Sequence, residues 1–86
     1  MGDIYLKNKM AKIIEKKLKE SYASSNLKSS IYDTETQELI VEFKKGGKYS
    51  YKDVPLQTVI SLRRAQSKGG YFNKNIAKVY NYKKIS

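Results

Sequence analysis

Apolar residues recur at helical spacing over the first quarter of the chain, with lysines mostly between them. In residues 4–22 these apolar positions are Leu6, Met10, Ile13, Ile14 and Leu18. The spacing predicts one amphipathic helix, and Asp3 before it suits both helix capping and the helix dipole. We expect the apolar stripe to pack on the domain behind it, with a dimer seam as the alternative. The lysine face is expected to be solvated rather than bound to a membrane or a nucleic acid.

The apolar period changes to two after a small, polar linker at residues 21–26. Alternating positions in residues 27–32 and 39–44 predict two strands, joined by a turn at residues 33–37. A second turn at residues 45–47 leads into a third strand at residues 48–52. The pattern therefore predicts a three-stranded antiparallel meander.

The register of the second hairpin decides which face of the sheet carries Tyr49 and Tyr51. A two-residue glycine loop would turn both tyrosines away from Val41 and Phe43. A three-residue loop that ends in a left-handed Gly47 would instead pair Phe43 with Tyr49 and Val41 with Tyr51. We favour this second register because it gathers the apolar side chains on one face. The tyrosines are then core-edge residues first.

Two helices are predicted after the meander. The first begins at Pro55, a residue favoured in the first turn of a helix, and ends at Ser67–Gly70, where a glycine can take the left-handed cap conformation. The second runs from Asn73, its N-cap, to Tyr80, and a tail of residues 81–86 follows. The predicted fold class is therefore α+β: an N-terminal helix within residues 1–23, then an α+β domain of residues 24–86 with three strands and two short helices.

Composition excludes several classes of function. The chain of 86 residues has no cysteine and no histidine, which removes disulfides, thiolate chemistry, the commonest metal ligand and the usual general base. The adjacent Ser67 and Lys68 alone do not favour a Ser-Lys catalytic pair. No apolar run resembles a signal peptide or approaches the ~20 residues needed to cross a bilayer. We expect a soluble, cytoplasmic, non-enzymatic protein with no membrane association, no cofactor and no metal.

The positive charge is concentrated in the last part of the chain. The net charge is +10, and residues 54–86 contain seven basic residues and no acidic residue. A lysine-rich composition is also expected from an AT-rich genome, but this does not explain the segregation. The asymmetry suggests a polyanion or an acidic protein surface as partner. The basic residues assigned to this surface are Arg63, Arg64, Lys68, Lys74 and Lys78, with Lys48 and Lys52 extending it beside the tyrosine strand.

Aromatic and amide side chains lie between these cations. Exposed bases of nucleic acids stack on flat side chains, for which Tyr71, or Tyr80 and Tyr82, are candidates, whereas Phe72 is interpreted as core. Asn73 can bond either a base edge or its own backbone, and we favour a helix cap. The segments 45–48 and 67–70 have glycines beside lysines but lack the full P-loop pattern, so both are interpreted mainly as turns.

Several short motifs, taken in order, resemble a known family. They are Ser25-Asn26-Leu27-Lys28-Ser29, Ile31-Tyr32-Asp33, Leu39-x-Val41-x-Phe43, Gly47-x-Tyr49-x-Tyr51, Val54-Pro55 and Ser67-x-Gly69-x-Tyr71-Phe72-Asn73-x-x-Ile76. Over residues 24–82 this order resembles the KTSC domain, named for its place at the C-terminus of some lysyl-tRNA synthetases and found as single-domain proteins in bacteria and phages. The resemblance implies a small α+β module with a role in binding RNA. It points to Tyr49, Tyr51, Tyr71, Phe72 and Asn73, and it assigns no catalytic residue.

Two functional hypotheses follow. The first is a basic module that binds RNA and grips its phosphates through the C-terminal basic helices. The second is a phage-type effector that binds a protein with an acidic or RNA-bearing surface, such as an inhibitor of a defence-system nuclease. The candidate binding residues for either partner are Lys48, Tyr49, Tyr51, Lys52, Arg63, Arg64, Lys68, Tyr71, Asn73, Lys74 and Lys78.

Overall fold

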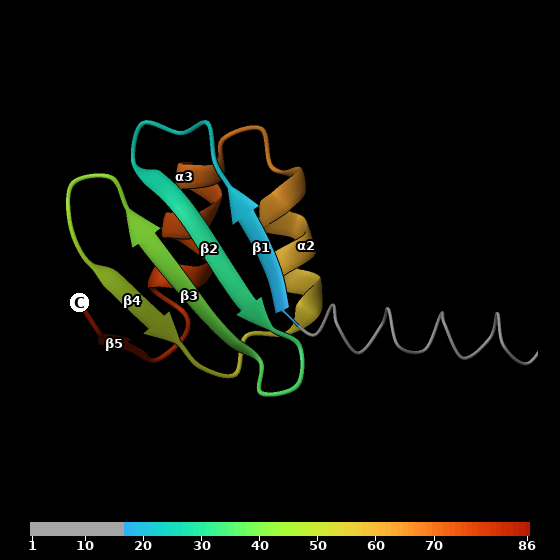
Figure 1. Ribbon diagram of the computed structural model, residues 1–86. Coiled ribbons are helices and arrows are strands. Elements are labelled where there is room, and N and C mark those ends of the chain that lie inside the picture. Colours follow the sequence, from blue (N-terminus) through green and yellow to red (C-terminus); the bar gives the residue numbers. More distant parts are fainter. Residues whose placement is uncertain (1–16) are drawn as a thin grey trace, which may run out of the picture.

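The protein is a two-layer α+β structure, a five-stranded antiparallel sheet with helices on one face (Figure 1). The computed structural model describes residues 17–86. Neighbouring strands in the sheet follow the order β1-β2-β3-β4-β5. In chain order the elements are β1 (Lys17–Ser21), β2 (Leu27–Asp33), β3 (Glu38–Phe43), β4 (Lys48–Tyr51), α2 (Leu56–Arg64), α3 (Lys68–Phe72), the π-helical turn η1 (Asn73–Ala77) and β5 (Tyr82–Lys84).

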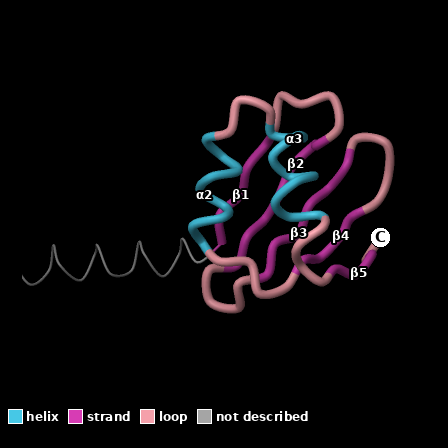
Figure 2. The backbone as a smooth tube through the Cα atoms, turned by 180° about the vertical axis from the view of Figure 1, so that it is seen from behind, coloured by secondary structure: helices cyan, strands magenta, loops and turns pink. Residues whose placement is uncertain are grey.

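The helices lie side by side over the sheet, as the view from behind shows (Figure 2). The chain forms four strands in succession, crosses the sheet face with α2 and α3, and returns to pair β5 with β4. The sheet therefore has β1 at one edge and β5 at the other. None of the helices in the described residues is long and apolar enough to cross a lipid bilayer.

The predicted arrangement of an N-terminal helix before a three-stranded meander is wrong. Residues 17–21 form strand β1, in which Leu18 pairs with Tyr32 and Glu20 with Ser30. Here exposed and half-buried side chains alternate, and the backbone ladder with β2 overrides the helical spacing of the apolar residues. The tail also forms a strand, β5, so the sheet has five strands rather than three. Residues 4–16 of the predicted helix, and the dimer seam proposed for it, lie outside the described residues.

The register between β3 and β4 is shifted by two residues from the favoured prediction. Val41 lies opposite Tyr49 and Leu39 opposite Tyr51. A shift of two leaves every side chain on its predicted face, since strand side chains alternate with a period of two. The turn uses positive φ angles of 123° at Gly46 and 89° at Gly47. Both tyrosines therefore face the helices, as predicted, although their partners differ.

The core fills the space between the inner face of the sheet and the two helices. Tyr32 reaches across it, and its hydroxyl donates a hydrogen bond of 2.5 Å to the carbonyl of Val54. Tyr22 and Ser30 share a buried hydrogen bond of 2.6 Å. The remaining buried apolar residues are Leu27, Leu39, Val41, Tyr51, Val54, Val59, Leu62, Phe72 and Ile76. Buried hydroxyls are thus paired within the core, as buried polar groups require.

The helix boundaries differ from the prediction at three places. Helix α2 follows Pro55 as expected but ends at Arg64, before the glycines. Ser67 is the N-cap of α3 and accepts a hydrogen bond of 3.2 Å from the Gly70 amide, so the glycines lie inside a helix rather than in a left-handed cap. A Cβ at Gly70 would lie 2.8 Å from the Ser67 Oγ, so the serine cap requires glycine there. Asn73 has helical dihedral angles and is not an N-cap, and the last helix extends over residues 68–77 rather than 73–80.

Candidate functional site

An open pocket of about 420 Å³ lies where the helix layer meets the β5 edge of the sheet. Its lining comes from the β1–β2 loop, the end of β3, the β3–β4 turn, strands β4 and β5, and the helical segment α3–η1. The lining residues are Asn26, Phe43, Lys45, Gly46, Tyr49, Tyr51, Phe72, Asn73, Ala77 and Tyr82. We call the segments β4, β5, η1 and the β3–β4 turn the open edge, and the segments β1, β2 and α2 the closed side.

Aromatic rings form the wall of this pocket. Phe43 contacts Tyr49 and Phe72 edge to face, at centroid distances of 5.6 and 5.5 Å. Tyr51 contacts Phe72 at 5.3 Å, and Tyr82 lies 5.7 Å from both Tyr49 and Tyr51. Phe72 and Tyr51 are only 2% and 4% exposed, whereas Tyr82 is 60% exposed. The cluster therefore runs from the core out to one solvent-exposed ring.

Strand pairing explains why these rings meet. Tyr51 lies opposite Tyr82, and Tyr49 lies opposite Lys84, in the β4–β5 ladder. Because side chains directly opposite in an antiparallel pair are about 5 Å apart, the return of the chain to β4 brings Tyr82 onto the tyrosine strand. The ends of β4 and β5 are further tied by a hydrogen bond of 2.8 Å from the Ile85 amide to the Lys48 carbonyl.

Polar groups accompany the rings in the pocket. Within residues 17–86, the side-chain amides of Asn26 and Asn73 have no protein hydrogen-bond partner, whereas Asn75 donates its amide to the Tyr71 carbonyl at 3.2 Å. Tyr51 lines the pocket and is 4% exposed, and its hydroxyl, which has no protein partner within residues 17–86, keeps some contact with solvent. Burial raises the pKa of Tyr51, and the neighbouring Tyr82 and Tyr49 raise it further, so the hydroxyl stays a proton donor at neutral pH. Donors and acceptors are thus available on a planar aromatic wall.

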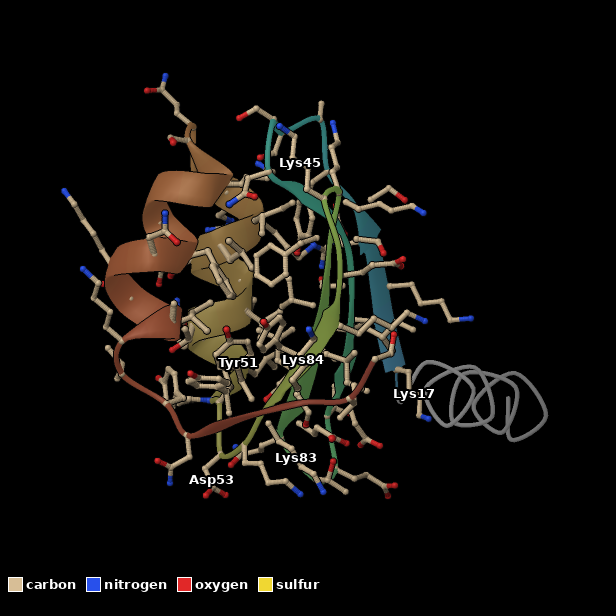
Figure 3. All side chains as sticks on the ribbon, turned by 90° about the vertical axis from the view of Figure 1, so that its left-hand side faces the viewer. Lys17, Lys45, Tyr51, Asp53, Lys83 and Lys84 are labelled. Carbon is tan, nitrogen blue, oxygen red and sulfur yellow. The ribbon has the colours of Figure 1, made fainter. Side chains whose placement is uncertain are left out.

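Lysines lie on three segments of the open edge, and one of them, Lys45, lines the pocket. Lys45 lines the pocket from the β3–β4 turn. Strand β5, which crosses the side of the molecule that Figure 3 faces, carries Lys84 opposite Tyr49 on the pocket face and Lys83 opposite Ser50 on the outer face. Lys74 lies in η1 next to the lining residue Asn73, and Lys78 directly follows η1. All five side chains are exposed, and none has a carboxylate partner within residues 17–86. The open edge is therefore strongly cationic.

Two of the three predicted cations near the C-terminal end of α2, Arg63 and Lys68, have oxygen partners within the protein. The Nε of Arg63 lies 3.0 Å from Oε1 of Glu20 on β1. The Nζ of Lys68 donates to the carbonyls of Arg63 at 3.0 Å and Ala65 at 2.8 Å, which caps the C-terminal end of α2. Arg64 is exposed and shares a surface hollow with Glu20 and Arg63. These three predicted site residues lie away from the pocket.

The other predicted site residues divide between the two faces of the sheet. Tyr49, Tyr51 and Asn73 line the pocket. Lys48 points to the outer face, where it lines a small hollow with Glu42 and Ile40. Lys52 is exposed after the end of β4, and its amide donates to the Asn81 carbonyl at 3.1 Å. Tyr71 is half-buried against the core and does not line the pocket.

Sequence reasoning missed several lining residues. The sequence pattern places Phe43 in the core, Asn26 in a linker, and Lys45 and Gly46 in a turn. It places Lys83 and Lys84, which lie on β5 outside the pocket lining, in a tail. Tyr82 was only an alternative stacking candidate. The alternation of Tyr80 and Tyr82 with Asn81 and Lys83 is the available signal for a strand, but it is too short to identify one. Among the described residues, no group of acidic, cysteine or histidine side chains could hold a metal ion.

Comparison with known proteins finds similarity to one domain family, to lysine–tRNA ligases and to a solved structure of the same family. A model of the KTSC domain family matches residues 23–82. The chain is 40% identical over 62 residues to a lysine–tRNA ligase of Trichormus variabilis, a segment that is 72% of this chain and 11% of the ligase. It is 47% identical over 51 residues to an uncharacterized protein of Stutzerimonas stutzeri, or 59% of this chain and 72% of that protein. The crystal structure of a KTSC domain protein from Yersinia pestis superposes with a TM-score of 0.77 at 28% identity, covering 81% of this chain and 99% of that one.

Proposed function

The chain belongs to the KTSC domain family, and on this premise we propose that it is a binding module that grips the phosphates of single-stranded RNA. The observation that carries the proposal is the set of unpaired lysines on the open edge. Phosphate oxygens are recognised by cationic donors, and such donors must have no internal partner to be available.

The contrast between engaged and available cations supports the open edge as the binding surface. Arg63 and Lys68 already have oxygen partners in the protein at 3.0 Å or less. The lysines around the pocket come from distant parts of the chain, Lys45 from a turn and Lys84 from the last strand, and the fold gathers them at one edge. A cationic surface built in this way is an electrostatic footprint for a polyanion.

The relatives favour RNA among polyanions. The ligase relatives are named for tRNA, although this chain spans only 11% of their length. Aromatic rings beside the cations point in the same direction, because unpaired bases of single strands stack on such rings, whereas bases inside a duplex are covered. The proposed module therefore binds RNA in single-stranded form.

The proposal is tested by the salt dependence of binding to a labelled single-stranded RNA, followed by fluorescence polarisation. For single strands, the logarithm of the affinity falls with the logarithm of salt concentration with a slope of about 0.7 per contacted phosphate. Lys74→Glu with Lys78→Glu should weaken binding and flatten this slope. Lys17→Glu with Lys19→Glu is the matched control, since it changes the net charge equally at the opposite edge of the sheet. Equal weakening by both double variants would refute a specific phosphate surface.

A protein partner is the alternative outcome of a second experiment. The tagged protein is captured from cells with and without nuclease treatment. RNA that is recovered from the untreated sample and lost from the Lys74→Glu, Lys78→Glu variant supports the proposal. A stoichiometric protein that survives nuclease treatment, without any co-purifying RNA, would instead indicate a protein-binding effector.

A further inference from the structure

The aromatic pocket on the open edge has features that phosphate binding does not need. Its volume of about 420 Å³ falls in the range of roughly 300–1,000 Å³ that is usual for small-ligand sites. Its wall is built from aromatic rings rather than cations, and it opens to solvent between the helix layer and the sheet edge. From these features we infer that the pocket receives one unstacked nucleobase of the bound strand. This inference rests on the proposed function and adds a site to it.

Tyr82 provides the stacking surface. Tyr82 is 60% exposed as a residue, yet its ring lies 5.7 Å from the rings of both Tyr49 and Tyr51, and its backbone is held in the β4–β5 ladder. A ring that is fixed before binding loses little conformational freedom when a base covers it. A nucleobase is flat, and it removes from water the apolar surface that Tyr82 leaves exposed.

Two side-chain amides and one hydroxyl are placed to meet the edge of the base. Asn26 and Asn73 enter the lining from separate segments, the β1–β2 loop and η1. Each amide has both a hydrogen-bond donor and an acceptor, and the edges of nucleobases carry complementary acceptors and donors. Tyr51 also lines the pocket, and its hydroxyl, which has no protein partner within residues 17–86, is a further donor. Neither asparagine has a protein partner to give up within residues 17–86.

Charge at the pocket mouth selects a nucleotide over a neutral aromatic ligand. Lys45 lines the pocket, and Lys84 lies opposite Tyr49 in the sheet. No Asp or Glu is among the lining residues in the described part of the chain. A base seated against Tyr82 would therefore have lysines near its own phosphate and those of its neighbours.

The decisive experiment compares two oligonucleotides of equal charge. One is a labelled single-stranded RNA, and the other has the same backbone with abasic sites in place of all its bases. The wild-type protein should bind the base-bearing strand about 5- to 150-fold more tightly, as expected for a stacked base. Tyr82→Ala should remove this preference, and Tyr82→Phe should keep it. Val79→Ala is the control, because Val79 is exposed to a similar extent, 61%, and does not line the pocket.

Free adenosine supplies a test that needs no phosphate binding. Its titration is followed by amide resonances of Gly46 and of the Asn26 and Asn73 side chains, which should shift together in the wild type and not in Tyr82→Ala. If the strands bind equally well with and without bases, or if Tyr82→Ala keeps the preference, the pocket assignment is overturned. If no RNA binds at all, the proposed function fails, and the adenosine titration then decides alone whether the pocket takes a base.

Discussion

Tyrosines and basic residues occur both on the closed side and on the open edge, but they make different contacts in the two regions. On the closed side the hydroxyls of Tyr22 and Tyr32 have partners inside the core, and the cation of Arg63 is paired with Glu20. On the open edge, aromatic rings contact one another around a pocket, and the neighbouring lysines have no carboxylate partner within residues 17–86. A tyrosine or a basic residue of this protein can therefore be assigned to a binding surface only when its hydrogen-bond and ion-pair partners are known.

The comparison predicts that core packing on the closed side outweighs ring packing on the open edge. Leu62, on α2, is fully buried, so Leu62→Ala should lower the free energy of unfolding by about 2–5 kcal/mol through lost burial and a cavity. Tyr82→Ala should cost about 1–3 kcal/mol, since it removes two aromatic pairs of roughly 0.5–1.5 kcal/mol each. Urea unfolding followed by circular dichroism measures both. Similar losses for the two variants would mean that Tyr82 is part of the core rather than an available ring.

The two turn glycines test how the open edge is assembled. Positive φ angles of 123° at Gly46 and 89° at Gly47 mean that alanine strains either position, by about 1–3 kcal/mol. At Gly47 a Cβ would also lie 3.2 Å from Tyr49 Cε1 and 3.3 Å from the Ser86 carbonyl oxygen, whereas at Gly46 nothing lies within 4 Å. Gly47→Ala should therefore destabilise more in urea unfolding and shift the amide resonances of β5. If Gly46→Ala is as damaging, crowding at β5 is not the cause.

Local patterns predicted the hairpins and the start of α2 but not the edges of the sheet. The alternation around Leu39 and Val41 was long enough to predict strands, and Pro55 marked a helix start. Residues 17–21 carry Leu18 at helical spacing from residues before it, and only pairing with β2 makes this segment a strand. Strand β5 has three residues and depends on β4 for its ladder.

The sequence predicted the residue types of the candidate site but not its position in the fold. The segregation of charge and the tyrosines of β4 pointed to a basic, aromatic surface. The sequence could not show that Arg63 meets Glu20 or that Lys68 caps α2, because both contacts depend on how β1 and α3 pack against α2. It also could not show that Asn26, Lys45 and Tyr82 converge, since they lie in three separate segments.

The free energy of unfolding should depend on pH in the alkaline range because of a buried tyrosine on the closed side, Tyr32. Burial raises the pKa of Tyr32 above the value of about 10 in an unfolded chain. Between those two pKa values the unfolded chain has lost a proton that the folded protein keeps, so stability is intact below about pH 10 and falls as pH rises toward the folded pKa. The expected slope is about 1.4 kcal/mol per pH unit for this one tyrosine. Urea unfolding from pH 9 to 11 (about one unit on either side of the reference pKa) should show a shallower decline for Tyr32→Phe than for wild type, and lysine ionisation cancels in the difference. Parallel curves would contradict the assignment.

The smallest expected effects, on stability and on the salt dependence of binding, distinguish a cation with an ion-pair partner from a cation without one. Arg63→Gln and Lys74→Gln each remove one positive charge, the first from the pair with Glu20 and the second from the open edge. Arg63 and Glu20 are partly exposed, so breaking their pair should cost about 0.2–1 kcal/mol of stability and leave the salt slope of RNA binding unchanged. Lys74→Gln should leave stability unchanged and reduce that slope by about 0.7. Urea unfolding and polarisation titrations at several salt concentrations measure the two quantities on the same variants. Both substitutions change the net charge equally. If the salt slope falls by the same amount in both variants, RNA binding depends on the overall charge of the protein. The distinction between the closed side and the open edge would then not explain binding.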